Sequence, residues 1–181
     1  MLALPNRRAF FWGVFVDYGR LFEQLKRHEG VRYSAYRCSR GFWTVGIGRN
    51  LEHNPLIDAE KMTVFGKLIS DADVIQRLMF SNLSPEHVEL LFLNDVAKAE
   101  ELCHKHLPMS ELNDARKAVF INMVFQMGLA GVLDFNDTLA CAAVGDYVGC
   151  AKAMLDSLWF RRDTPGRAQE LSDQMLTGEW Q

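Results

Sequence analysis

The sequence lacks the features that define several classes of protein. Its 181 residues include 13 Gly and five Pro, too few for a collagen-like or low-complexity chain. Lys and Arg number 20 against 23 Asp and Glu, so no excess positive charge favours sequence-independent binding of nucleic acid. The four cysteines form no CxxC pair, which argues against a structural zinc site and a disulfide framework. We expect reduced thiols and no nucleic-acid partner.

Long apolar runs are also missing. Residues 9–16 and the interrupted run 120–133 fall short of the roughly 18 to 20 residues that a spanning helix needs, so we expect no integral membrane segment. Asn6-Arg7-Arg8 before the first run resembles the start of a signal peptide, but no small-residue cleavage site follows before Asp17. We expect residues 1–18 to be a leading extension that packs on the domain surface.

What is present is the composition of a folded domain. Hydrophobic residues make up 49% of the chain and charged residues 24%, and the length suits one domain. Twelve Phe and four Trp argue against disorder, because burying such side chains offsets the entropy that the chain loses on folding.

Local patterns predict a small β region followed by helices. Leu21, Phe22 and Leu25 recur at helical spacing, and Gly30 stands where a left-handed C-terminal cap belongs, so a helix should end at Glu29. Residues 31–49 are aromatic and β-branched with intervening glycines, which favours short antiparallel strands.

The second half of the chain predicts a helical lobe. Ser84-Pro85-Glu86 starts a long helix to about His106, whose apolar stripe passes through Asp95; a buried acid there needs a partner. Residues 114–128 are apolar on all sides and should form a central helix, on which Asn122 and Gln126 share one face. Shorter helices should cover 138–144 and 147–158, and a last helix should open at Thr164-Pro165 and stop before Gly178. The predicted fold class is α+β, mostly α.

Glu29 is the first candidate for chemistry. It occupies the last turn of its helix, where the negative end of the helix dipole disfavours a second negative charge and so favours the protonated carboxyl that a general acid requires. A solvated glutamate at a helix end is the alternative interpretation. Cys38 follows nine residues later and Thr44 six residues after that, before the turn Gly46-Ile47-Gly48.

The order Glu29, Cys38, Thr44 resembles the catalytic signature of the phage-type lysozymes, glycoside hydrolase family 24. The similarity runs from about residue 19 to residue 180, leaving out the first 18 residues and a longer segment between Arg49 and Ser84. The matching stretches are His28-Glu29-Gly30, Trp43-Thr44-Val45-Gly46-Ile47-Gly48, Ile121-Asn122-Met123-Val124-Phe125-Gln126-Met127-Gly128, Thr164-Pro165-Gly166-Arg167 and Thr177-Gly178-Glu179-Trp180.

The resemblance implies a lysozyme-like two-lobed fold and an endolysin-type muramidase. Such an enzyme hydrolyses the β-1,4 bond between N-acetylmuramic acid and N-acetylglucosamine in peptidoglycan, without cofactor or metal. Glu29 would be the acid, and Cys38, where family members have either Asp or Cys, would assist water together with Thr44. The Cys38 thiol could act as base, water-positioner or nucleophile, or could only fill space.

Other residues carry implied supporting roles. Arg167 matches the arginine that holds the catalytic glutamate, whereas His28 replaces an acid beside it. Arg49 replaces a histidine, so we predict an Arg49–Asp95 ion pair that stabilises the fold. The implied substrate-binding residues are Phe125, Gln126 and Thr138, with core packing an equal alternative for Phe125, and Asn122 should be structural.

The domain organisation that we expect is an extension, residues 1–18, and a lysozyme domain, residues 19–181. The β-containing lobe covers about 31–83, and the helical lobe covers 84–181 together with the helix 19–29. We expect a monomer that binds bacterial glycan strands and stays in the host cytoplasm until it is released to the periplasmic peptidoglycan. A lytic transglycosylase, or a catalytically weak domain for wall binding or virion structure, is the alternative.

Overall fold

The computed structural model describes residues 16–181. The predicted packing of a leading segment therefore lies outside the described residues, except at its end. Val16 is buried in the core, and the Asp17 carboxylate caps the first helix by accepting from the Arg20 N–H. That helix begins at Tyr18, one residue before the predicted boundary.

Helix α1 (Tyr18–Glu29) ends as predicted and buries Leu21 and Leu25 against the core. The Gly30 N–H donates to the Lys26 carbonyl, and Gly30 has φ +72°, a value that favours glycine. Its ψ of 176° lies outside the left-handed helical region that the sequence predicted. The extended ψ sends the chain directly into the first strand.

The β region is a three-stranded antiparallel sheet in the order β1 (Arg32–Arg37), β2 (Trp43–Gly46) and β3 (Arg49–Asn50). Tyr36 on β1 lies opposite Thr44 on β2. A tight turn connects these strands: the Cys38 N–H donates to the Phe42 carbonyl, and the Gly41 N–H donates back to the Cys38 carbonyl.

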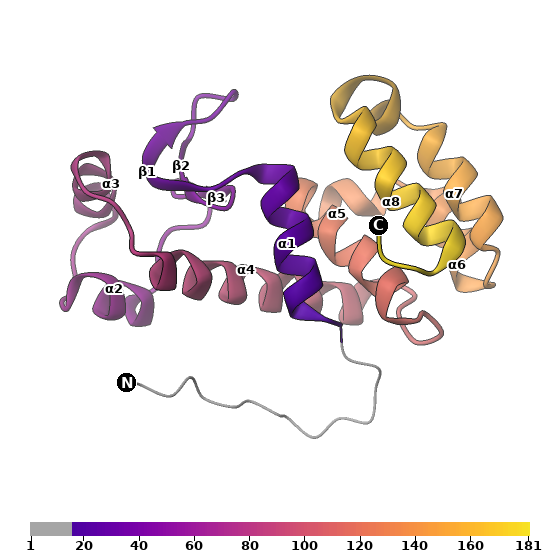
Figure 1. Cartoon of the computed structure of the whole chain (residues 1–181), viewed down its shortest axis with the longest axis horizontal. Coiled ribbons are helices and arrows are strands. Elements are labelled where there is room, and N and C mark those ends of the chain that lie inside the picture. Colours follow the sequence, from indigo (N-terminus) through magenta and orange to yellow (C-terminus); the bar gives the residue numbers. More distant parts are fainter. Residues whose placement is uncertain (1–15) are drawn as a thin grey trace.

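Two helices that the sequence did not predict complete this lobe, α2 (Asp58–Phe65) and α3 (Asp71–Phe80). Each has a polar start: Glu60 accepts from the Ile57 N–H, and Ser70 accepts from the Asp73 N–H. Figure 1 shows both helices at the end of the molecule that also carries the sheet.

Helix α4 (Pro85–His106) starts and ends where the sequence predicted and runs from this end towards the helical lobe (Figure 1). The central helix α5 (Asp114–Leu133) buries Asn122 and most apolar neighbours, as expected. Its regular part ends at Gly128, where φ +75° and ψ 166° break the helix before it continues to Leu133.

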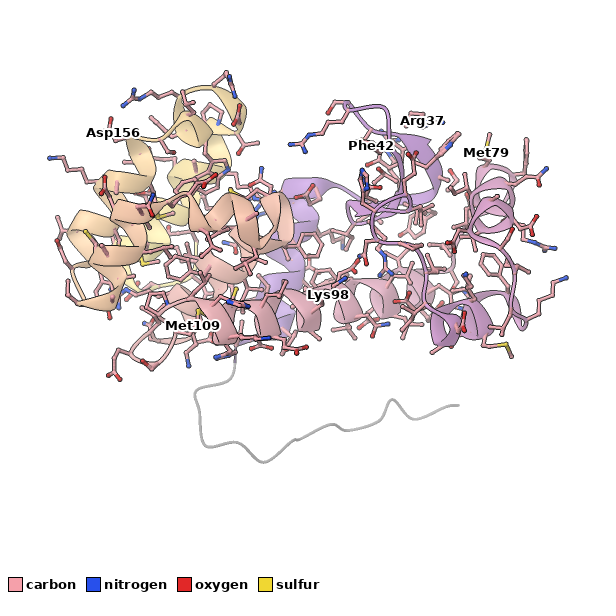
Figure 2. The ribbon with its side chains drawn as sticks, turned by 180° about the vertical axis from the view of Figure 1, so that it is seen from behind. Arg37, Phe42, Met79, Lys98, Met109 and Asp156 are labelled. Atoms are coloured by element: carbon pink, nitrogen blue, oxygen red, sulfur yellow. The ribbon has the colours of Figure 1, made fainter. Side chains whose placement is uncertain are left out.

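Three further helices and a short π-helical turn complete the helical lobe: α6 (Asn136–Ala143), α7 (Tyr147–Leu155), the turn Trp159–Asp163 and α8 (Pro165–Thr177). Helix α7 ends three residues before the predicted boundary, whereas α8 stops before Gly178 as expected. Figure 2 shows Phe42 and Met79 on the β lobe and Met109 and Asp156 on the helical lobe. The predicted fold class, α+β and mostly α, is confirmed.

Two sequence expectations concern features beyond the fold class. No single helix within residues 16–181 is long and apolar enough to cross a membrane; α5 and α6, bent by 99° relative to each other, pass that test of length and composition only as a pair. All four cysteines are free, as predicted.

Candidate active site

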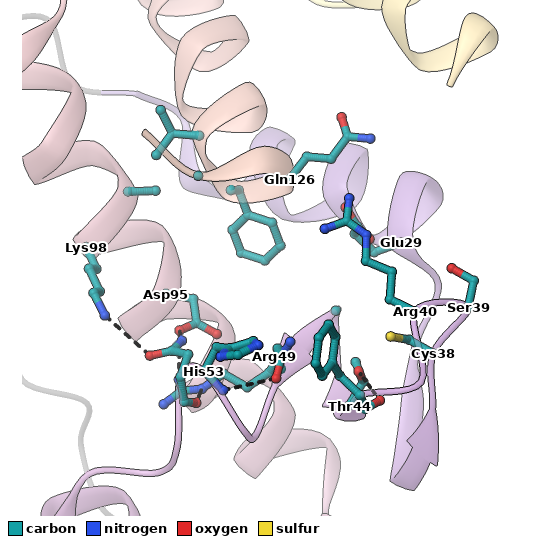
Figure 3. A pocket seen from close by; sticks show the side chains of 18 of the residues that line it. Glu29, Cys38, Ser39, Arg40, Thr44, Arg49, His53, Asp95, Lys98 and Gln126 are labelled. Atoms are coloured by element: carbon teal, nitrogen blue, oxygen red, sulfur yellow. Dashed lines mark hydrogen bonds and ion pairs between the residues drawn. The ribbon is translucent and has the colours of Figure 1, made fainter. Parts of the chain in front are cut away.

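A cleft of about 810 Å³ collects most of the residues singled out by sequence. Its lining includes the three predicted catalytic residues and two of the three predicted substrate-binding residues (Figure 3): Glu29, Cys38, Thr44, Phe125 and Gln126. A neighbouring hollow of about 1060 Å³ contains the third, Thr138, and shares lining residues Ser39, Arg40 and Gln126 with the first. The two hollows therefore adjoin, which suits an extended ligand.

Glu29 reaches this cleft from the end of α1 and is backed by an arginine from α8. Its side chain is 23% exposed, and its Oε1 accepts from Nη1 of Arg167 at 2.5 Å. Asn122 holds the other side of the guanidinium, with its Oδ1 2.9 Å from Nε and its backbone carbonyl 3.2 Å from Nη2 of Arg167. The sequence predicted both the Arg167 contact and a structural role for Asn122.

Gly48 leaves room for the Glu29 carboxylate. A Cβ atom on Gly48 would lie 3.2 Å from Oε2 of Glu29, and the φ of +71° at Gly48 is one that side chains rarely adopt. The glycine-rich turn after β2 therefore allows the sheet to approach the acid closely.

Cys38 and Thr44 face the cleft from the sheet. Burial alone would raise the pKa of the Cys38 thiol, but backbone hydrogen bonds from Arg40 and Phe42 act in the opposite direction. The Thr44 hydroxyl and the positive charge of Arg40 add to these, so that the pKa of Cys38 lies below its ordinary value. At a given pH near neutrality, a larger fraction of Cys38 is therefore in the thiolate form than for an isolated cysteine.

Thr44 is itself buried and tied to the backbone. Its Oγ1 donates to the Phe42 carbonyl at 3.2 Å. A hydroxyl has one proton, so Thr44 donates either to this carbonyl or to the Cys38 sulfur, and in both cases its lone pairs can accept from a water molecule.

Tyr36 is a cleft residue that the sequence analysis missed. It lies directly opposite Thr44 in the sheet, and residues paired across two strands point to the same face, so Tyr36 shares the cleft with Thr44. Burial, followed by the nearby charges of Cys38 and Glu29, raises the pKa of its phenol. The hydroxyl therefore stays protonated in the cleft. Its pairing with Thr44 across the predicted antiparallel strands was the signal that could have identified it.

The far wall of the cleft contains Phe42 and His53, whose rings meet edge to face with centroids 4.7 Å apart, and the cation Lys98. Lys98 Nζ donates to Oδ1 of Asn54 at 3.3 Å. Phe42 comes from the turn before β2, His53 from the loop after β3 and Lys98 from α4, and no sequence motif connects them.

The predicted substrate-binding residues differ in how much they present to the cleft. Phe125 is half-buried and packs near Phe92, with ring centroids 6.1 Å apart, so it serves both the core and the cleft wall. Gln126 accepts from the Trp159 indole at 3.0 Å and donates to the Thr164 hydroxyl at 3.2 Å. Thr138 is only 1% exposed, so little of it is available to a ligand.

The predicted Arg49–Asp95 ion pair is present in the lining of the cleft, with Nη1 2.7 Å from Oδ1. The sequence did not predict a second buried acid, Glu60, whose Oε2 lies 2.9 Å from Nη2 of Arg49. Burial outweighs the attraction of Arg49 and raises the pKa of Asp95. Asn54 completes the cluster by donating to Asp95 at 2.7 Å.

Within the described residues, no group of three or more His, Cys, Asp and Glu side chains is arranged to hold a metal ion. Among the residues that line the cleft, Glu29 offers a carboxyl, Cys38 a thiol and Thr44 a hydroxyl. An acid held next to a cleft that also contains a potential base suits general acid–base hydrolysis of an extended polymer.

Comparison with known proteins identifies one family and several relatives that this chain resembles over most of its length. The sequence model of the phage lysozyme family matches residues 26–170. The chain is similar to the pre-baseplate central spike protein Gp5 of Enterobacteria phage T4, with 32% identity over 86% of this chain but only 27% of that protein. It is also similar to probable T4-type lysozyme 1 of Dictyostelium discoideum, with 30% identity over 86% of this chain and 93% of the relative. An endolysin of Acyrthosiphon pisum secondary endosymbiont phage 1 is 24% identical over 81% of this chain and 82% of the relative.

Proposed function

The chain belongs to the phage lysozyme family, and we propose on that basis that it is an endolysin-type muramidase. Its substrate would be the β-1,4 bond between N-acetylmuramic acid and N-acetylglucosamine in bacterial peptidoglycan. The observation that carries the proposal is the Glu29 carboxyl, held by Arg167 in a cleft that also presents Cys38 and Thr44. Only a carboxyl that is held in place yet open to the cleft can donate its proton to a bound glycosidic oxygen.

The proposed reaction follows the inverting scheme. Glu29 donates its proton to the glycosidic oxygen, and the bond from that oxygen to C1 of the muramic sugar breaks. Water attacks C1 from the opposite face and gives up one proton, while Glu29 regains a proton from solvent. The products are a free 4-hydroxyl on one sugar and a reducing end on the other.

Cys38 is the proposed acceptor of the proton from water. The lowered pKa of its thiol makes the thiolate available, and the free lone pairs of Thr44 can orient the same water. Direct attack by the sulfur on C1 is the alternative role, and it would give a covalent intermediate and retention of configuration.

The proposed glycan path follows the two adjoining hollows. Phe125 and Gln126 would contact sugars near the acid, and Thr138 would line the second hollow.

The proposal includes the division into an extension, residues 1–18, and a lysozyme domain of two lobes. It also includes the route from the host cytoplasm to the periplasmic peptidoglycan and action as a monomer.

A second candidate is a catalytically weak lysozyme domain that serves for wall binding or as part of a virion. Similarity to a central spike protein favours it, whereas 93% coverage of a probable lysozyme favours a free enzyme. A lytic transglycosylase, in which the muramic 6-hydroxyl replaces water as the nucleophile, needs only the acid.

Mass spectrometry of the fragments released from purified peptidoglycan separates these candidates. Reducing N-acetylmuramic ends would support hydrolysis, and anhydro ends would replace it with transglycosylation. No fragments from a folded sample, beside a working lysozyme control, would contradict both reactions and leave wall binding or assembly.

A further inference from the structure

His28 lies directly before the proposed acid and is nearly enclosed, with its side chain 7% exposed. Its two ring nitrogens meet partners of opposite character. Nε2 lies 3.1 Å from Oε2 of Glu170, and Nδ1 lies 3.4 Å from Nδ2 of Asn122. Which nitrogen carries the proton follows from the groups around them.

The orientation of the Asn122 amide is fixed by Arg167. A guanidinium only donates hydrogen bonds, so the atom of Asn122 that lies 2.9 Å from Nε of Arg167 must be the amide oxygen. The reverse orientation would set N–H groups against N–H groups. The Asn122 NH₂ group therefore points to the other side, towards His28 and Gln24.

The orientation of the Gln24 amide is set by its own hydrogen-bond partners. Gln24 Nε2 donates to the Glu170 carboxylate at 3.0 Å and to Oε1 of Gln174 at 2.7 Å, which leaves Gln24 Oε1 to accept from Asn122 at 3.1 Å. The remaining Asn122 N–H faces Nδ1 of His28, which must then be the acceptor and carry no proton. The ring proton belongs on Nε2, where it is donated to Glu170.

We propose that neutral His28, protonated on Nε2 alone, is a positioning residue for the acid. Its Nδ1 accepts from the Asn122 amide and so keeps that amide in the orientation in which its oxygen accepts from Arg167. Arg167 in turn donates to Glu29. A proton on Nδ1 would face the Asn122 NH₂ group, donor against donor, and so weaken the hydrogen bond between Asn122 and Arg167. The effect on rate rests on the proposed function, whereas the protonation state of the ring does not.

The charges around His28 suit the neutral ring. Burial lowers the pKa of His28, the Glu170 hydrogen bond partly offsets this, and the cations Arg167 and Arg27 lower it further. Glu170 and Arg167 face the ring from α8, Arg27 from α1 itself, and the uncharged Asn122 from α5. Unfolded His28 takes up a proton more readily than folded His28, so its contribution to stability falls as the pH drops below the ordinary histidine range. Activity should fall in the same acidic direction.

A matched pair of amide substitutions tests which nitrogen matters. His28→Asn places a carbonyl oxygen near the Nδ1 position, where it can accept from Asn122, whereas His28→Gln places an amide nitrogen near Nε2 and leaves no acceptor for Asn122. We expect His28→Asn to keep kcat within a few-fold of the wild-type value. Because Asn does not titrate, this variant should also lose the decrease in activity at acidic pH that protonation of His28 causes. His28→Gln should lower kcat about tenfold with KM unchanged, because a slightly misplaced acid is costly. Gln has a higher helix propensity than Asn, so an effect of the substitutions on α1 alone would make His28→Gln the less damaged variant, the opposite of the expected ranking of kcat.

The control is His106→Gln, an exposed residue at the end of α4, which should leave the kinetics unchanged. Equal kcat in the paired variants, or a more active Gln variant, would overturn the proposal. An independent readout is the ¹⁵N spectrum of the His28 ring in the wild-type protein near neutral pH. The Nε2–H neutral tautomer is expected, and an Nδ1–H or doubly protonated ring would overturn the proposal even if the protein had no muramidase activity.

Discussion

At the scale of the residue, Cys38 distinguishes this cleft from one that contains two carboxylates. Its thiol has a lowered pKa because neighbouring backbone groups, Thr44 and Arg40 outweigh the effect of burial. Burial and the charges of Asp146 and Asp137 instead raise the pKa of Cys141. Cys38 should therefore be the cysteine with the greatest fraction of thiolate at a given pH, and the most reactive one.

Alkylation with iodoacetamide tests this expectation. Lytic activity should fall in parallel with the extent of Cys38 modification, which peptide mass mapping measures. Soluble glycan fragments should slow both the modification and the loss of activity. Cys38→Asp, which restores the acid of the relatives, should stay active and resist the reagent. Full activity in a sample with Cys38 completely modified would leave this side chain only a space-filling role.

Sequence succeeded at residues that lie in recognisable motifs and failed at those brought together by folding alone. Glu29, Arg167 and the Arg49–Asp95 pair were predicted from motifs and departures from them. Glu60 was not, because its contact with Arg49 depends on how the segment after β3 folds back.

At the scale of the element, the turn after β2 matters because it sets the distance between sheet and acid. Gly48 and Gly41 both have positive φ, but only at Gly48 would an added Cβ atom come within 4 Å of Glu29. Gly48→Ala and Gly41→Ala should each cost about 1–2 kcal/mol of unfolding free energy through backbone strain. Only Gly48→Ala should also lower kcat, by displacing Glu29. Urea unfolding and initial lysis rates check this, and equal loss of rate in both variants would refute it.

The ion-pair cluster of Arg49, Glu60 and Asp95 at the cleft connects β3 to α2 and α4. Arg49, which is 4% exposed, forms ion pairs with both Asp95 and Glu60, whose side chain is 2% exposed. Arg49→Met should destabilise the fold by about 3–5 kcal/mol, because it leaves buried carboxylates without their cation. The same substitution at Arg162, 71% exposed and paired with Asp163, should leave the unfolding free energy unchanged. Similar urea midpoints for the two variants would contradict the assigned role of the cluster.

Ser-Pro and Thr-Pro starts were recognised in the sequence, whereas α3 was missed although Ser70 caps it and Val74 and Leu78 are buried. Ser84-Pro85 and Thr164-Pro165 marked α4 and α8 because capping and proline geometry act locally. Helix α2 has Glu60 as its buried residue, so burial there follows an ion pair instead of hydrophobic periodicity. The continuation of α5 past Gly128, whose φ of +75° and ψ of 166° break the helix, was not predicted either.

At the scale of the whole molecule, the site exists because distant segments converge. The acid comes from α1, its arginine from α8, the amide between them from α5, and the thiol from the turn after β1. The resemblance to a family predicted this convergence, whereas composition and periodicity predicted only the mixture of strands and helices. The volume of the cleft and its continuity with the second hollow could be found only in three dimensions.

The most direct test of the central claim is the rate at which Glu29→Gln releases fragments from purified peptidoglycan. The substitution removes the proton donor with little change of shape, so the rate should fall at least about 100-fold while the thermal unfolding profile stays that of a folded protein. Glu23→Gln, an exposed residue on the same helix, is the matched control and should retain the wild-type rate. A folded Glu29→Gln protein with a rate close to that of the wild type would contradict the assignment of Glu29 as the acid.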